Sequence, residues 1–175
     1  ISYRDEILSS TVVLEDATFG PISLSRSEID LRGTWPQFTG SLNYEATLPV
    51  LGEVRPVSGT HGLSLNTETR DLALDGGLTL AGQAFTFVAP LRVNLSADPQ
   101  ITAQVAAFDG NIELALQPLT KTPSNLTLTD LNLQKFGPLI NRPALRGTVN
   151  GSAEIALVDE QLTGSINAAI ADLAR

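Results

Sequence analysis

Hydrophobic and polar residues alternate with a period of two over the last thirty residues of the chain. Every second residue from Leu145 to Leu157 is apolar or glycine, and the alternation resumes from Leu162 to Ile170 after the acidic pair Asp159–Glu160. Because successive side chains of a β-strand point to opposite faces, this period gathers the apolar residues on one face and Ser, Thr and Asn on the other. The pattern predicts a β-hairpin over residues 143–173.

Short alternating runs of the same kind recur along most of the chain, separated by turn residues. Their spacing predicts about ten to twelve short strands and an all-β sheet, sandwich or barrel. Short connections favour antiparallel pairing. The period breaks in two places. A phase slip near Ser25–Glu28 predicts a bulge or a tight turn, and the segment Leu131–Ile140 predicts a short helical turn or a crossover.

Glycine and proline lead to two further local predictions. The stretch that contains Pro49, Gly52, Pro56 and Gly59 is expected to be an irregular edge or loop, because proline cannot donate to a sheet ladder. The tripeptide Asp75–Gly76–Gly77 is typical of a tight hairpin turn, so Leu78 and Leu80 are expected to begin a returning strand.

Composition narrows the possible functions. Of the 175 residues 42% are hydrophobic but only 5% aromatic, so aliphatic side chains dominate, as they do in a lining compatible with lipid or in an ordinary aliphatic core. The net charge is -8, and Lys121 and Lys135 are the only lysines. Nucleic acid, which needs clustered basic residues, is therefore rejected as a partner. The absence of cysteine excludes disulfide and thiolate chemistry.

No residue pattern points to catalysis, a metal or a cofactor. His61 is the only histidine and is expected to be structural or exposed, and one histidine without cysteine does not make the usual zinc set. Asp71, Asp75, Asp109 and Asp130 are expected near turns, where aspartate bends the backbone. Neither a nucleophile elbow nor a glycine-rich phosphate loop is present. The prediction is a protein that is not an enzyme.

Two sets of near-repeats lead to a family resemblance. Residues 39–43 resemble 163–167, and 126–131 resemble 168–173. In the second pair a strand ends in Asp-Leu, and strands with a Leu-x-Gly motif follow the helical turn. The matching positions are Asp130, Leu131, Leu145, Gly147, Leu162, Gly164, Asp172 and Leu173. Over these fifty or so residues the chain resembles the repetitive C-terminal region of the AsmA-like, or TamB, family and its YdbH-like relatives.

This resemblance implies a curled antiparallel sheet, a β-taco or open groove, with an apolar concave face. It also implies that residues 1–175 are one β-rich segment of a longer protein, anchored in the inner membrane of a Gram-negative bacterium and spanning the periplasm. The implied function is to shield and conduct phospholipid acyl chains toward the outer membrane, with a link to an outer-membrane assembly protein. The expected groove residues are Leu42, Leu114, Leu128, Leu145, Val149, Ile155, Leu162, Ile166 and Ile170.

Two other functions are consistent with the same pattern. Exposed strand edges would let the sheet act as a chaperone or scaffold for outer-membrane β-barrel proteins, by pairing with a client strand. A closed structural β-sandwich would use the apolar face simply as its core. The residues alone do not choose among these alternatives.

Overall fold

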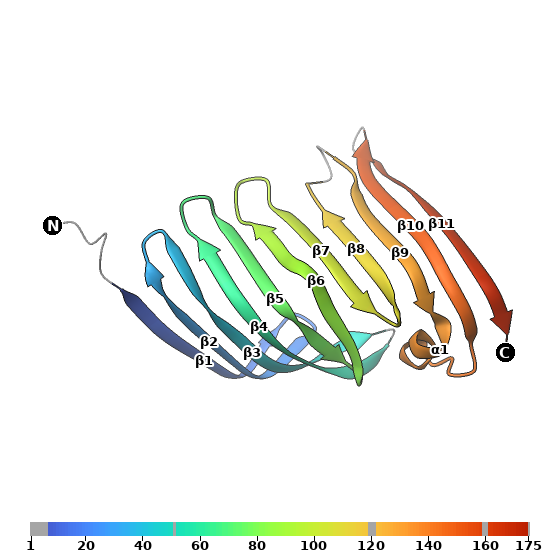
Figure 1. Ribbon diagram of the computed structural model, residues 1–175, viewed down its shortest axis with the longest axis horizontal. Helices are drawn as coiled ribbons and strands as arrows, with labels where there is room; N and C mark the ends of the chain where they lie inside the picture. Colours follow the sequence, from blue (N-terminus) through green and yellow to red (C-terminus); the bar gives the residue numbers. More distant parts are fainter. Residues whose placement is uncertain (1–6, 51, 119–121, 159–160, 175) are drawn as a thin grey trace. The chain divides into compact units, whose positions relative to one another are not determined.

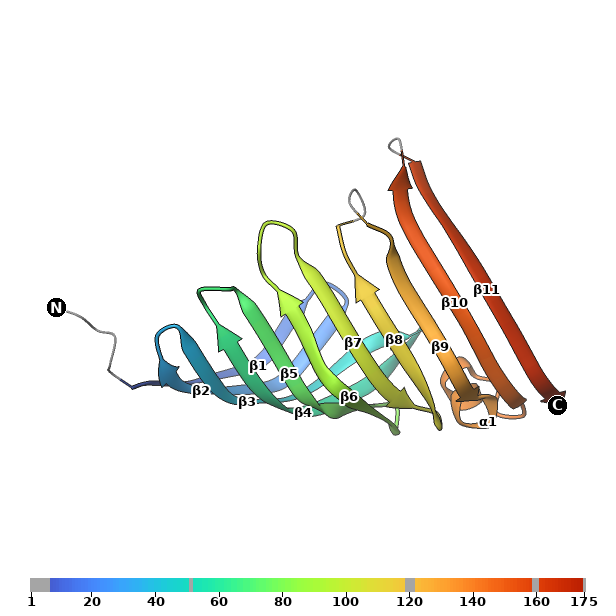
Figure 2. The same ribbon diagram turned by 45° about the horizontal axis from the view of Figure 1, so that its top comes forward.

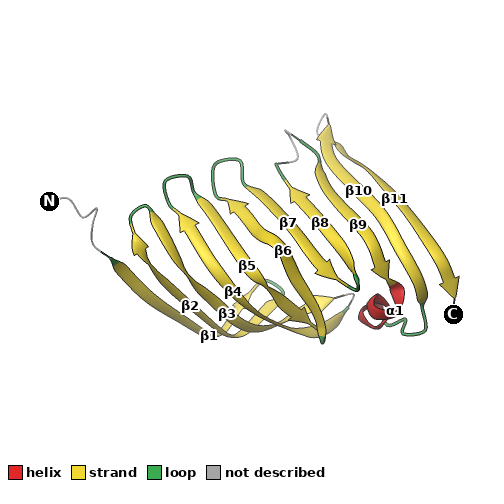
Figure 3. Cartoon of the chain, viewed as in Figure 1, coloured by secondary structure: helices red, strands yellow, loops and turns green. Residues whose placement is uncertain are grey.

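The computed structural model describes residues 7–50, 52–118, 122–158 and 161–174. Over these residues the chain is β-structure apart from one short helical segment, which confirms the predicted fold class (Figures 1 and 3). The strands are β1 Leu8–Phe19, β2 Ile22–Thr34, β3 Gln37–Val50, β4 Glu53–Asn66, β5 Asp71–Leu80, β6 Gln83–Asn94, β7 Gln100–Ala107, β8 Gly110–Leu116, β9 Ser124–Asn132, β10 Arg146–Val158 and β11 Gln161–Ala174. Between β9 and β10 lie α1, Leu133–Phe136, and the 3₁₀ helix η2, Gly137–Ile140.

Hydrogen-bonded neighbours follow the order of the chain. Among the described residues the order is β1 to β11 without a crossover, in one sheet that does not close into a barrel. Each strand therefore pairs with the strand before it, as the short connections predict. The hairpin predicted over residues 143–173 is β10 and β11, with Ala153 opposite Ile166 and Val149 opposite Ile170. The acidic pair Asp159–Glu160 lies outside the described residues.

The chain divides into two compact units, Ile1–Phe85 and Thr86–Arg175, called unit 1 and unit 2 below. In unit 1 the strands β1 to β4 bend markedly along their length (Figures 1 and 2). The register of β2 against β3 shifts between Leu24 and Arg26, so Ser25 is an extra residue at the predicted place. In β1, Asp16 has a positive φ of 49°. Bulges of this kind bend a strand and increase its twist.

The prediction of an irregular edge or loop around Pro49–Gly59 is wrong as to the loop, because Pro49 and Val50 end β3 and residues 53–59 begin β4. The pairing of β4 with β5 begins only at Val57, so the start of β4 does lie at an edge of that ladder. Pro56 is tolerated because its backbone polar groups face the β5 side of β4 and not β3. The carbonyl of Pro56 accepts a hydrogen bond of 2.9 Å from the amide of Ala81. In an antiparallel sheet the amide of the same residue would face the same neighbour. Since β5 has already ended at Leu80, the missing amide removes only the last bond of that ladder.

The hairpin predicted at Asp75–Gly76–Gly77 is also wrong. These residues lie inside β5, where Gly76 is directly opposite His61 and Asp75 is opposite Gly62. Gly76 has φ +99°, a conformation that residues with a side chain rarely adopt. The tight turn comes later, at Ala81–Gly82, where both φ values are positive. Asp-Gly therefore marks an irregular strand position here, next to the only histidine.

The helical turn predicted over Leu131–Ile140 is confirmed by α1 and η2. The Asn132 side chain begins α1 by accepting a hydrogen bond of 3.0 Å from the Gln134 amide. Leu133 is buried, and the ring of Phe136 packs edge-on against Phe108 with centroids 5.3 Å apart. No side chain in the described part of the chain is completely buried, so the fold has no thick central core.

Candidate functional site

Five strands of unit 2 build a continuous apolar face. Residues directly opposite each other in an antiparallel pair point to the same side of the sheet, so the strand registers identify rows that cross the strands. We call them the apolar rows. One row is Ala103, Leu114, Leu126, Ala153 and Ile166; a second is Val105, Ile112, Leu128, Gly151 and Ala168; a third is Leu131, Val149 and Ile170. Aliphatic side chains and glycine make up all three rows.

Two aspartates with positive φ occur at breaks in the strand register of this face. Asp130 has φ 54° where the β9–β10 register shifts, and Asp172 has φ 52° where the β10–β11 register shifts. The extra residue changes the phase of β9, so that Leu128 and Leu131 both join the apolar rows although they are three residues apart. The Asn150 amide stabilises the first bulge through bonds of 2.8 and 3.1 Å to Asp130. The near-repeat of 126–131 and 168–173 therefore has a structural basis.

Much of the apolar face is open to solvent. Ile166 is 82% exposed, Leu162 68%, Ile170 52% and Ile155 44%. Leu114, Leu128 and Val149 are half-buried, in agreement with their places on more central strands. Leaving one such side chain fully in water costs about 1.5–3 kcal/mol relative to burying it. An apolar ligand that covered these side chains would therefore recover part of this free energy.

Four of the predicted groove residues lie outside the apolar rows. Two of these, Ile155 opposite Gly164 and Leu162 opposite Leu157, still lie on the same face of β10 and β11. Leu145 precedes β10, in the connection after η2, where its amide donates a hydrogen bond of 3.1 Å to the Arg142 carbonyl. Leu42 belongs to unit 1, where it lies in β3 opposite Ile29 and His61. The other seven predicted residues are all on β8 to β11 of unit 2.

His61 is a buried structural residue in unit 1, with an exposure of 3%. Its ring stacks on Tyr44 at a centroid distance of 5.6 Å, and its Nδ1 lies 3.1 Å from the Asp75 carbonyl oxygen. A Cβ on Gly59 would lie 2.6 Å from His61 Nε2, so glycine makes room for the stacked rings. Burial also raises the pKa of the Tyr44 hydroxyl. The arrangement joins β3, β4 and β5 and leaves little of the imidazole accessible to a substrate.

An exposed polar cluster holds α1 to the β7–β8 hairpin. Lys135 Nζ pairs with Asp109 Oδ1, and Asn132 Nδ2 donates to Asp109 Oδ2 at 3.0 Å. These two hydrogen bonds, and then the charge of Lys135, lower the pKa of the Asp109 carboxyl. Asp109 has a positive φ in the turn between the strands, which agrees with the turn role predicted for it.

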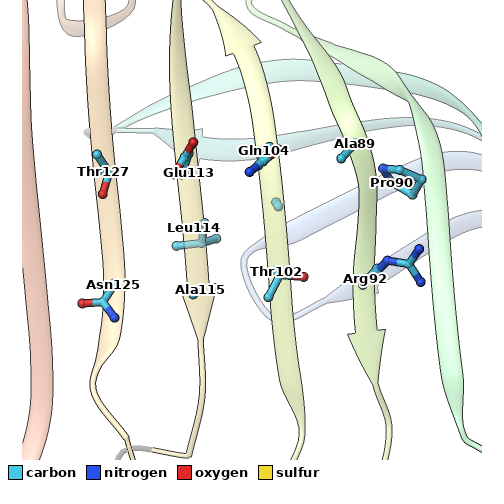
Figure 4. Close-up of a pocket in the computed structure, with 11 residues that line it drawn as sticks. Ala89, Pro90, Arg92, Thr102, Gln104, Glu113, Leu114, Ala115, Asn125 and Thr127 are labelled. Carbon is cyan, nitrogen blue, oxygen red and sulfur yellow. The ribbon is translucent and has the colours of Figure 1, made fainter.

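The opposite face of unit 2 is polar and carries an open groove of about 390 Å³ (Figure 4). It spans four strands, β6 to β9. Its lining is Ala89, Pro90, Arg92, Thr102, Ala103, Gln104, Glu113, Leu114, Ala115, Asn125 and Thr127. Ala103 and Leu114 also belong to the first apolar row, and the polar lining residues lie on the opposite face. Sequence reasoning identified the polar face but not this groove, because the period of two shows which side a residue faces and not where a surface is hollowed.

Further features bear on chemistry and on membranes. Within the described residues, no group of three or more His, Cys, Asp or Glu side chains is placed to hold a metal ion. No helix in the same part of the chain has the length and apolar character to cross a bilayer. Comparison with family models, curated proteins and solved structures finds no match to this chain.

Proposed function

We propose that the apolar rows of unit 2 bind the acyl chains of phospholipids and let them move along the sheet without contact with water. The observation that supports this proposal is the set of aliphatic rows on β7 to β11 that remain partly open to solvent, above all at Ile166. The protein acts here as a surface and performs no reaction, in keeping with the absence of any catalytic motif.

The energy scale explains why such a surface would be useful. Moving a two-chain lipid through water exposes about 30 methylene groups at about 0.8 kcal/mol each, on the order of 25 kcal/mol in total. A row that crosses five strands spans about 19 Å at about 4.8 Å per strand. That length is comparable with one extended acyl chain, so a few neighbouring rows would cover most of the apolar part of a lipid.

We place this activity in the envelope of a Gram-negative bacterium, in a periplasmic segment of an inner-membrane-anchored protein. This part of the proposal rests on the resemblance of residues 126–173 to the AsmA-like, or TamB, family. The Asp-Leu bulges at Asp130 and Asp172 support it, since both near-repeats adopt the same backbone conformation at the aspartate. Transfer from the inner to the outer membrane is the direction that the resemblance implies.

The test compares neighbouring positions on one strand. A photocrosslinking amino acid replaces either Ile166, in an apolar row, or Asn167, which faces the other side; both positions are exposed. After illumination with vesicles of phosphatidylethanolamine and phosphatidylglycerol, mass spectrometry should find lipid adducts at position 166 and few at 167. Equal labelling of the two positions would refute lipid binding by the apolar face.

A transfer assay extends the test to function. Ile166→Asp places a charge in the apolar row, whereas Asn167→Asp places the same charge on the polar face. We expect only the first variant to slow the movement of labelled phospholipid between donor and acceptor vesicles. If both slow it equally, the effect comes from charge or folding and the proposed route fails.

A further inference from the structure

The groove on the polar face of unit 2 has the features of a second binding site, whose polar side chains all lie outside the apolar rows. Glu113 and Thr127 are directly opposite each other on β8 and β9, as are Ala115 and Asn125 one row away. Thr102 pairs with Ala115, and Gln104 pairs with Glu113, so β7 adds to the same rows. The groove therefore lies on a regular part of the sheet, whose backbone bonds fix the spacing of these side chains (Figure 4).

Most polar side chains of this groove have no hydrogen-bond or ion-pair partner among the described residues. In the described part of the chain, five of the six form no hydrogen bond or ion pair through their side chains: Arg92, Thr102, Gln104, Glu113 and Thr127. The side-chain amide of Asn125 donates to the Pro123 carbonyl at 3.3 Å. A second groove, on β1 to β3 of unit 1, differs in this respect, because its Thr11 hydroxyl donates to Asp30 at 2.6 Å. The groove of unit 2 thus keeps most of its side-chain donors and acceptors available for a ligand.

The chemistry of the lining selects the class of ligand. Arg92 donates only, Glu113 accepts only, and the amides and hydroxyls of the groove do both. One positive and one negative group together favour neither an anion nor a cation, and the net charge of -8 further disfavours anions. A hydroxyl group, which both donates and accepts, suits such a mixed set. Ala89, Pro90 and Ala115 add small apolar patches against which the C–H face of a sugar ring can pack.

We propose that this groove binds a neutral, hydroxyl-rich ligand, that is, one or two sugar units of an uncharged glycan. Its volume of about 390 Å³ lies at the lower end of the range for small-ligand pockets and suits a short segment of such a chain. The ligand is either a soluble saccharide or the sugar head group of a neutral glycolipid; the hydroxyl chemistry is the same for both.

The experiment is an NMR titration of the whole protein with maltotetraose, cellotetraose and chitotetraose, and separately with phosphatidylcholine vesicles with and without a neutral diglycosyl lipid. Binding should shift the side-chain amide signals of Gln104 and Asn125 and the Nε signal of Arg92. Response to the saccharides identifies a soluble glycan, and response only to the glycolipid vesicles identifies a head group. No response to any of them would overturn the proposal.

Matched variants place the ligand in the groove. Glu113→Gln and Thr127→Val should each weaken binding about tenfold, because each leaves a ligand hydroxyl without its partner. Glu154→Gln and Thr129→Val are the controls: Glu154 and Thr129 share the polar face, since they are opposite Asn125 and Asn111, but they do not line the groove. Equal losses in test and control variants, or binding only to a sulfated glycan or a peptide, would refute the site.

Discussion

Replacing one well-buried and one exposed residue of the apolar rows with alanine tests whether the apolar face is a surface or a core. Leu131 is 5% exposed and Ile166 is 82% exposed, and both lie in unit 2. Each substitution removes three carbons, about 2.4 kcal/mol of transfer free energy when the site is fully buried. For Leu131→Ala nearly all of this transfer free energy is lost, and the cavity that the smaller side chain leaves adds a further cost. We therefore expect a destabilisation of about 3 kcal/mol.

For Ile166→Ala only about a fifth of the transfer term applies, roughly 0.4 kcal/mol, because most of the side chain already contacts water. Lower β-propensity adds up to about 1 kcal/mol. Urea unfolding, followed by a probe in unit 2, measures both variants, and the slope of free energy against urea shows whether the denatured state has changed. A loss for Ile166→Ala as large as that for Leu131→Ala would mean that protein covers this face, and the lipid proposal would lose its basis.

Three further predictions concern the backbone and the polar clusters. Asp130→Ala should destabilise the protein by about 1–3 kcal/mol in urea, since alanine disfavours the positive φ and loses the hydrogen bond that Asn150 Nδ2 donates to the Asp130 carboxylate. Asp130→Gly should cost less, because glycine tolerates the positive φ; the reverse order would contradict a strained bulge. Gly59→Ala should lower the melting temperature, because its Cβ would overlap the two stacked rings beside it; an unchanged value would contradict this packing. The Asp109 carboxyl has a lowered pKa in the folded state, so its contribution to stability is present above the unfolded pKa and is lost as the pH falls through the folded pKa. Lys135→Met should raise the folded-state pKa of Asp109 in an NMR titration, because it removes the largest cause of the lowering. An unchanged pKa would contradict that cause.

The sequence pattern predicted those parts of the fold that depend on a period of two. The alternation predicted a hairpin with its apolar residues on one face, and in β10 and β11 Val149 is opposite Ile170 and Ala153 is opposite Ile166 on that face. The broken period at Leu131–Ile140 identified the only helical segment of the described chain. These features are local, since each depends on which face a residue occupies and not on distant contacts.

The failed predictions depended on the neighbouring strand. Pro56 is acceptable in β4 because β5 ends opposite Val57, a fact about the partner strand that no local pattern contains. Likewise, Asp75–Gly76 was expected to turn the chain, but Gly76 is opposite His61 and the ladder continues through it. The groove at Glu113 was missed for the same reason, since the hollow depends on how four strands lie side by side.

The two faces of unit 2 use the same strands for different chemistry, and this makes the two proposals separable. Ala153 and Ser152 are neighbours in β10, yet the first belongs to a row that ends at Ile166 and the second to a row that contains Thr127. A change in one row leaves the side chains of the other in place, because the backbone bonds between the strands do not depend on either set. Variants of Ile166 should therefore alter lipid labelling without altering saccharide binding, and variants of Thr127 should do the opposite. Coupled losses would indicate that both act on the sheet itself, and neither face would then be assigned a ligand.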